Sequence, residues 1–250
     1  MSIQFTHNGH RYKLDGKPVP GVTTLLGGGI PKPALMYWAA NTAAQYAIDH
    51  PGASYDEIRK AHTVERDTAG IRGTAVHDLA EQLVHGDAVE VPEELAPYVD
   101  GYVRFLDDWG IVPILTEKVI GSRRDWYAGR FDLIATSPHL HNGAPVMIDL
   151  KTSSGVYGET ALQCAAYSLA EFWQDDDGAE HPLPEIAASY VAHVTPDGTV
   201  LYQLAADRVQ MARHLDMFRA AAFTHRTSKE RDNIITEPLT TPTHEMSRAS

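Results

Sequence analysis

The spacing of apolar residues changes along the chain near Gly110. Before it, apolar residues recur every three or four positions, the period of an amphipathic helix. After it, several segments alternate apolar and polar residues, the period of a strand. The helical spacing predicts helices at 33–49, 54–69, 73–86, 92–109, 158–173 and 207–227. The alternating spacing predicts strands at 3–6, 11–14, 112–120, 126–135, 145–151, 186–194 and 199–204.

Some boundaries have local signals of their own. Pro33 suits the first position of a helix, and Ser54 with Glu57 forms a capping-box pattern before the next one. The run GVTTLLGGGIPKP at 21–33 contains three successive glycines and is predicted to be a loop. A phosphate-binding loop is disfavoured there, because the Gly-Lys-Ser/Thr ending is absent.

The order of these elements predicts a helical N-terminal half, then β-β-β-α-β-β and a closing helix. That order is typical of an α/β (α+β) protein in which helices flank a mixed central sheet. We expect a single domain at 1–235, with an N-terminal hairpin and helical region at 1–110 and a catalytic core at 111–235. The tail at 236–250 is polar and rich in Pro and Thr, so it is predicted to be disordered.

Composition narrows the class of protein. The chain has 250 residues, 43% of them hydrophobic, which is enough for a sizeable core. No apolar run approaches the ~18 residues of a membrane span. The N-terminus also lacks the pattern of a signal peptide. We therefore expect a cytoplasmic protein with no membrane partner. Cys164 is the single cysteine, which excludes an intrachain disulfide and a four-cysteine iron–sulfur cluster.

The formal net charge of −12 argues against a protein that coats nucleic acids. It leaves room for local binding, because a metal ion supplies positive charge at a phosphate and basic residues could gather on one face. Two segments carry such residues: Arg59, Lys60, Arg66 and Arg72 in one, and Arg123, Arg124 and Arg130 in the other. Scattered, solvated charges explain each group equally well.

Three polar residues interrupt the predicted apolar strands 126–135 and 145–151. They are Asp132, Asp149 and Lys151. Alternation places Asp149 and Lys151 on one side, and Asp132 can converge with them if the two strands are hairpin neighbours. Two carboxylates bind a hard cation such as Mg²⁺ or Mn²⁺, and a nearby lysine offsets charge on a reacting phosphate. A structural Asp–Lys pair is the alternative, although the apolar flanks make simple solvent exposure less convincing.

Two helices carry further polar pairs. On the helix from Gly73, His77 and Glu81 lie beside a predicted core stripe formed by Val76, Leu79, Ala80, Leu83 and Val84. A neutral imidazole at His77 could ligate Mn²⁺, and a surface His–Glu pair is the alternative. Gln163 and Tyr167 share one face of the 158–173 helix, where a core-edge Tyr with a hydrogen-bonded Gln is the simplest interpretation.

Four short segments occur in order: RGTAVHDLAE at 72–81, AGRFDLIA at 128–135, VMIDLKTS at 146–153 and ALQCAAYSLA at 161–170. Together they resemble the RecB-like branch of the PD-(D/E)xK nuclease superfamily, over roughly 71–173. The resemblance implies a restriction-endonuclease-like sheet and assigns roles by position. His77, Asp132 and Asp149 would be metal ligands, with the Leu150 carbonyl as an additional one, and Lys151 would be catalytic. Supporting or DNA-binding roles would fall to Gln163, Tyr167, Arg72 and Glu81, with Glu117 a weaker candidate.

The resemblance also implies an activity. It indicates a Mg²⁺- or Mn²⁺-dependent DNA exonuclease of the phage type, acting on linear ends in recombination, repair or replication, in the host cytoplasm if phage-encoded. The iron–sulfur cysteines of some relatives are missing, and so is a helicase motor. Translocation would therefore come from a recombination or replication partner, or from a homo-oligomer. A structure-specific or nicking endonuclease is one alternative, and a non-catalytic DNA-binding recombination accessory module is another.

Overall fold

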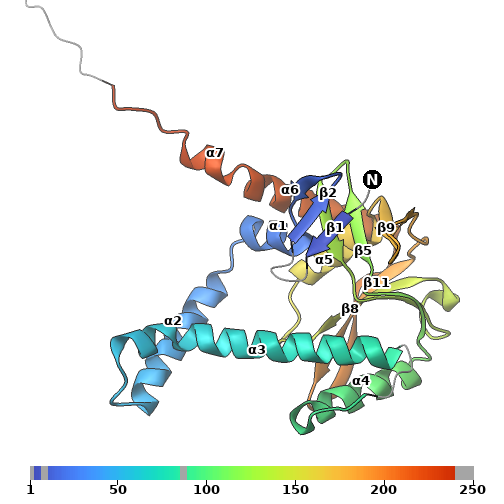
Figure 1. Cartoon of the computed structure of the whole chain (residues 1–250), viewed down its shortest axis with the longest axis horizontal. Coiled ribbons are helices and arrows are strands. Elements are labelled where there is room, and N and C mark those ends of the chain that lie inside the picture. The colour runs from blue at the N-terminus through green and yellow to red at the C-terminus, as the bar shows by residue number, and fades with distance from the viewer. Residues whose placement is uncertain (1–2, 7–10, 85–88, 240–250) are drawn as a thin grey trace, which may run out of the picture.

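The computed structural model describes residues 3–6, 11–84 and 89–239 (Figure 1). Within them, five strands form a central sheet in the order β12-β11-β8-β7-β4. Its strands are β4 (Val112–Thr116), β7 (Leu133–Thr136), β8 (Val146–Lys151), β11 (Ala188–Thr195) and β12 (Gly198–Ala205). The β8–β11 pair is parallel and the other pairs are antiparallel. The expected α/β class with a mixed central sheet is confirmed.

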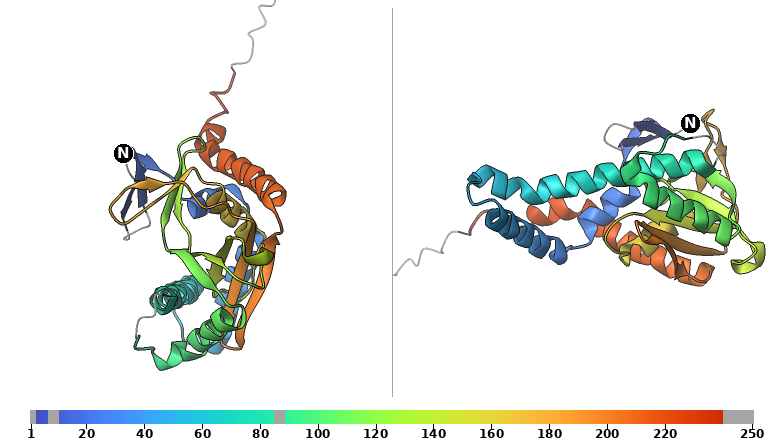
Figure 2. Two further views of the ribbon diagram at one scale, coloured as in Figure 1. Left: turned by 90° about the vertical axis from the view of Figure 1, so that its right-hand side faces the viewer. Right: turned by 90° about the horizontal axis from the view of Figure 1, so that it is seen from below.

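Helices cover both faces of this sheet (Figure 2). One face packs against α1 (Val22–Gly29), α5 (Glu159–Ser168) and α6 (Arg208–Arg226). The other packs against the end of α3 (Tyr55–Val84) and against α4 (Ala96–Asp108), which follows the short 3₁₀ turn Glu93–Leu95. Both faces of β8 are therefore buried, which explains its near-continuous apolar sequence.

Two smaller sheets adjoin the central one. One has the order β10-β9-β5-β6, with β5 (Val119–Ser122), β6 (Tyr127–Arg130), β9 (Phe172–Gln174) and β10 (Glu180–His181). The other is formed by β1 (Ile3–Thr6), β2 (Arg11–Leu14) and β3 (Lys17–Val19). The remaining helices are α2 (Pro33–Asp49), whose bounds match the sequence prediction, and α7 (Ser228–Asp232). In the described part of the chain, no helix is long and apolar enough to cross a membrane.

Two predicted long strands are each divided in two. The predicted strand 112–120 breaks at Glu117 into β4 and β5, and 126–135 breaks at Phe131 and Asp132 into β6 and β7. The breaks lie at the same level, since the Glu117 N–H donates to the Asp132 carbonyl at 2.9 Å. Glu117 has a φ of 51°, a left-handed conformation that redirects the strand. The paired strands thus leave the central sheet and enter the second one together.

The helix containing His77 is longer than predicted. The expected break at 69–73 is wrong, because α3 runs without interruption from Tyr55 to Val84. Gly73 instead permits a close approach, since an added Cβ would lie 3.1 Å from the Thr152 hydroxyl. The predicted capping box is confirmed: the Ser54 N–H donates to Glu57 Oε2 at 2.7 Å. The predicted end of this helix at 86 lies outside the described residues.

The later elements follow the prediction with one exception. The 158–173 helix ends at Ser168, because residues 172–174 pair with β5 as strand β9. The final hairpin is formed by β11 and β12, and α6 begins after Asp207, whose carboxylate accepts from the Gln210 N–H. Most of the tail predicted to be disordered lies outside the described residues.

The glycine run at 27–29 belongs to helix α1, so the predicted loop is wrong. Val22, Leu25 and Leu26 are buried at helical spacing and anchor α1 in the core. The last glycines let α1 cross α6 closely: a Cβ on Gly29 would meet the Ala221 carbonyl oxygen at 2.0 Å. These glycines therefore allow α1 to pack closely against α6, and they do not mark a flexible loop.

Replacing Gly29 by alanine is therefore expected to lower the free energy of unfolding by about 2–3 kcal/mol, because the backbone of α6 must move. Gly27 is the matched control, since no atom lies within 4 Å of a Cβ added there. Gly27→Ala should stabilise the protein by roughly 0.5–1 kcal/mol through helix propensity. Urea unfolding of both variants measures the difference, and equal effects would contradict the close crossing.

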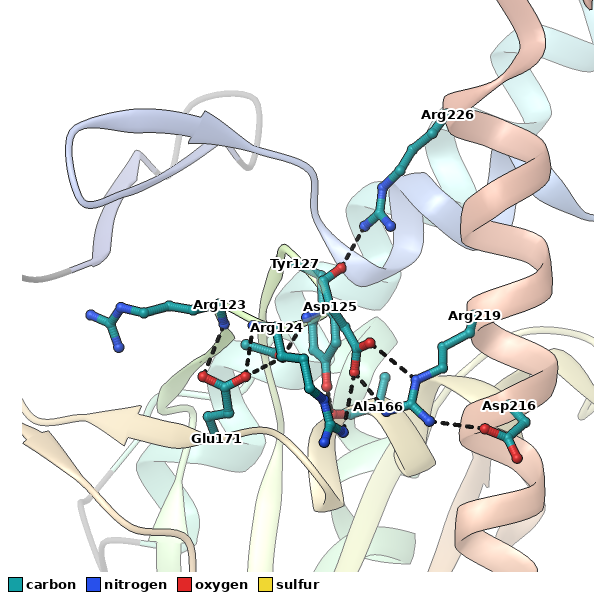
Figure 3. A network of polar contacts seen from close by, with 10 residues as sticks. Arg123, Arg124, Asp125, Tyr127, Ala166, Glu171, Asp216, Arg219 and Arg226 are labelled. Carbon is teal, nitrogen blue, oxygen red and sulfur yellow. Dashed lines mark hydrogen bonds and ion pairs between the residues drawn. The ribbon is translucent and has the colours of Figure 1, made fainter.

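Polar contacts hold the turn at Arg123–Asp125, and Figure 3 shows those that it makes with Glu171 and Arg219. Arg123 Nε lies 2.8 Å from Asp15, and Arg124 lies 3.6 Å from Asp125. Asp125 also pairs at 2.9 Å with Arg219 of α6. These contacts connect the β5–β6 turn to α6 and match charge locally. They favour a structural role for Arg123, whereas the Arg124 side chain is 71% exposed.

Candidate metal centre

Three side chains from distant parts of the sequence meet at the strand breaks. One ligand atom each of His77, Glu117 and Asp132 lies within 4.8 Å of the others. His77 comes from α3, Glu117 from the β4–β5 junction and Asp132 from the β6–β7 junction. They line a cavity of about 20 Å³ whose wall also includes Tyr102 and Leu150. A cavity of this size suits one ion or water molecule.

Asp132 is oriented by the neighbouring strand. Its Oδ2 accepts the Leu150 N–H at 2.6 Å, while its Oδ1 lies 3.5 Å from His77 Nδ1. Because residues 131–132 have left the β ladder, this carboxylate can bond to the backbone of β8. One oxygen is thus fixed by the sheet and the other faces the imidazole.

Glu117 is held by an arginine. Arg130 Nε lies 2.8 Å from Glu117 Oε2 and also donates to the Glu117 carbonyl at 3.0 Å. The same guanidinium reaches Glu81 at 3.3 Å. Arg130 therefore anchors the left-handed backbone at Glu117 and places its carboxylate beside Asp132.

The proximity of these groups shifts their ionisation. Burial and the Asp132 charge raise the pKa of Glu117 to about 8, although Arg130 opposes the shift. Burial alone would lower the pKa of His77, but the Asp132 carboxylate outweighs it and raises that pKa to about 9. The pKa of Asp132 is lowered despite burial, because His77 and Lys151 are close. Without metal, the cluster balances its charge by holding protons.

This donor set fits a divalent cation. Two carboxylates and an imidazole provide hard oxygen ligands and one nitrogen, a combination suited to Mn²⁺ and, through the carboxylates, to Mg²⁺. The neighbouring, half-buried carboxylates of Glu117 and Asp132 repel each other unless one of them holds a proton. A bound cation would offset this repulsion in place of the proton. The single cysteine, Cys164, is buried, and an iron–sulfur cluster held by four cysteines is excluded.

A second polar cluster lies along β8 and α5. Asp149, only 2% exposed, has its Oδ2 2.5 Å from Lys151 Nζ. Gln163 donates to Asp149 Oδ1 at 3.0 Å and to the Tyr167 hydroxyl at 3.3 Å. Tyr167 in turn packs where a Cβ on Gly129 would meet its ring at 2.5 Å. The glycine and the aromatic residue of the sequence motifs therefore fit against each other.

Electrostatics within this cluster favour a charged lysine. Burial raises the pKa of Asp149 to about 6, with Lys151 opposing the shift. Burial would lower the pKa of Lys151, but the Asp149 and Asp132 carboxylates raise it above its ordinary range. In the metal-free protein the Lys151 ammonium group therefore stays protonated at neutral pH, and its positive charge lies beside the candidate metal ligands.

The structure brings together most of the residues singled out in the sequence, in a different grouping. His77 and Asp132 meet as expected, but the third member of their group is Glu117, whereas Asp149 pairs with Lys151. Asp132 lies at a strand break and not within a strand as predicted, so strand alternation does not set its orientation. Leu150 lines the cavity and its N–H donates to Asp132, whereas the family resemblance implies a role for its carbonyl.

Three other residues complete the comparison. Glu81 lines the cavity and pairs with Arg130. Arg72 is exposed, and its guanidinium lies over the ring of Tyr98, 5.8 Å from the centroid. Arg130 was noted in the sequence only as a basic residue. Its signal was its place two residues before Asp132, in the segment AGRFD.

Comparison with known proteins gives no family assignment. The sequence matches no model of a known protein family and no curated protein. Among solved structures, one similar chain is described as the crystal structure of SSO0001, with 14% identity and a TM-score of 0.29. The match covers 79% of this chain and 73% of that one.

Proposed function

We propose that this protein is a Mg²⁺- or Mn²⁺-dependent DNA exonuclease of the RecB-like PD-(D/E)xK type. One observation carries the proposal: a half-buried group of His77, Glu117 and Asp132 lies beside the ion pair that the buried Asp149 makes with Lys151 on β8. Burying several carboxylates is costly unless a cation compensates their charge. Groups of this kind are concentrated at functional sites. The ordered motifs of the sequence independently point to the same chemistry.

Each residue has a distinct task in this proposal. His77, Glu117 and Asp132 would hold the cation, and Asp149 would complete the acidic set on the β8 side. When bound, the metal polarises the phosphate and lowers the pKa of a coordinated water. Arg130 positions Glu117, and the Leu150 N–H positions Asp132. Gln163 holds the orientation of Asp149.

Lys151 acts through its charge. In the metal-free protein, the Asp149 and Asp132 carboxylates raise its pKa above the ordinary range and favour the protonated ammonium. A fixed ammonium stabilises negative charge that grows on the phosphate oxygens in the transition state. We therefore assign stabilisation of charge to Lys151, with positioning or activation of the attacking water as the alternative role.

The choice of DNA ends as substrate rests on the sequence resemblance. A structure-specific or nicking endonuclease would use the same residues. A non-catalytic accessory module is disfavoured, because the acidic residues, the histidine and the lysine are all present. The process served would be recombination, repair or replication in the cytoplasm.

Digestion of end-labelled linear DNA and of covalently closed circular DNA tests the proposal. In Mg²⁺ or Mn²⁺ the linear substrate should be degraded and the circle spared, and EDTA should stop the reaction. Degradation of both substrates would select the endonuclease. Activity that persists in EDTA, or no cleavage of any DNA in either metal, would reject metal-dependent nuclease action.

A further inference from the structure

A helical arm projects from the body of the protein (Figures 1 and 2). It consists of α2 and the first half of α3, which pack against each other. None of the 17 residues of α2, all within the described part of the chain, is buried, and Asp49 is its single charged residue. An exposed helix of this composition is unusual, because surface helices ordinarily have a charged outer face.

The apolar residues of α2 form an ordered outer ridge. Its inner face, including Trp38 and Tyr46, is half-buried against α3. On the outside, Met36, Ala40, Ala44 and Ile48 follow one another at four-residue spacing. The two large members are each 70% exposed, and both alanines are exposed. Rows at this spacing are the ridges through which helices pack on one another.

The ridge is complementary to itself. Its two large residues stand at the ends and its two alanines in the middle. If two copies of α2 lie antiparallel about a two-fold axis, Met36 faces Ile48 of the other copy and Ala40 faces Ala44. A symmetric dimer requires this reciprocity, in which each patch meets the same patch of its partner. The central alanines would let the helices approach closely.

The charge of the arm favours a second copy of this chain over DNA as the partner of the α2 ridge. Residues 33–72 carry five acidic and four basic side chains, a net charge of −1 out of −12 for the chain. Some of these charges already pair within the arm, as in Arg59–Asp56 and Arg66–Asp67. Two chains this acidic repel each other over most of their surface but not here. A neutral, apolar ridge offers nothing to phosphates.

We propose that α2 is the contact of a homodimer, packed antiparallel against α2 of a second copy. The helix is about 25 Å long and about 10 Å wide, so its outer face offers roughly 250 Å². Two such faces bury less than the roughly 1,000 Å² expected of a stable interface, so we expect a weak, concentration-dependent dimer. This inference is independent of the proposed nuclease activity, because the ridge contains none of the candidate metal ligands.

Sedimentation equilibrium tests the dimer directly. The apparent mass of the wild-type protein should rise from the chain mass of 27.5 kDa towards twice that mass as the concentration is raised to about 100 μM. Met36→Glu combined with Ile48→Glu should raise the dissociation constant roughly 100-fold or more, with an unchanged circular dichroism spectrum. Val209→Glu is the matched control, since Val209 is 79% exposed on α6. A monomer at all concentrations, or a dimer that the double variant leaves intact, would overturn the proposal.

Disulfide trapping tests the antiparallel arrangement. Cys164 is fully buried and does not interfere. A mixture of Ala40→Cys and Ala44→Cys chains should form a mixed covalent dimer in preference to either homodimer, because these positions face each other. Preferential Ala40–Ala40 linkage would indicate a parallel contact, and cross-linking no faster than at a control Thr68→Cys would indicate none. Either result would reject the arrangement.

Discussion

Asp132→Asn is expected to reduce metal-dependent DNA cleavage by roughly 1,000-fold or more. Asp132 belongs to the three-residue group, faces His77 and is fixed by the Leu150 N–H. Asparagine keeps the shape and can still accept that N–H, but it removes the negative charge that attracts the cation. The protein should therefore remain folded while metal-dependent turnover is lost.

Two comparison variants make this result specific. Asp78→Asn alters an exposed carboxylate next to His77 on the same helix and should retain wild-type cleavage. Lys151→Ala should lose cleavage to a similar degree yet still bind Mn²⁺, because Lys151 supplies charge and not a ligand. Cleavage rates together with Mn²⁺ titration separate the two roles. Cleavage by Asp132→Asn at the wild-type rate would remove Asp132 from the mechanism.

The sequence predicted which elements carry the site better than it predicted how they meet. His77 and Asp132 could be singled out because they are polar residues within or beside predicted apolar segments, where a polar side chain needs a partner. The ordered motifs then suggested a metal as that partner. Glu117 could not be ranked correctly. Its role depends on a left-handed backbone and on the shared break of two strand pairs, and alternation of residue types shows neither.

The same limit explains the errors in the fold. Local composition identified α2 and the capping box, because the deciding interactions lie within a few residues of each other. The glycines at 27–29 predict a loop, and the stretch at 69–73 predicts a break with a restart at Gly73. In the structure, Gly29 instead lies close to α6 and Gly73 close to Thr152. That distinction depends on partners about 190 and 80 residues away in sequence. Local propensity does not contain it.

Glu117→Gln is expected to reduce the loss of stability that the metal-free protein shows as pH rises. The pKa of Glu117 is raised from 4.5 to about 8, so the folded protein keeps a proton that the unfolded chain releases. Stability from this group is complete below pH 4.5 and is lost as pH rises towards 8. His77, with its pKa raised from 6.5 to about 9, adds a loss of the same sign at higher pH. Glutamine does not ionise, so it should remove the first loss, of the order of a few kcal/mol.

With metal bound, the stability of the wild-type protein should rise with pH, whereas without metal it falls. The cation binds deprotonated Glu117 and neutral His77, so at pH 7 binding should release roughly one to two protons and its affinity should rise with pH. Urea unfolding at pH 6, 7.5 and 9, in EDTA and in Mn²⁺, measures both effects. In EDTA at pH 9 Glu117→Gln should be more stable than the wild type, and Mn²⁺ should stabilise the wild type alone. Glu65→Gln, an exposed change on α3, should follow the wild type throughout. If Mn²⁺ stabilises Glu117→Gln as strongly as the wild type, Glu117 is not a ligand and Asp149 must take the third position.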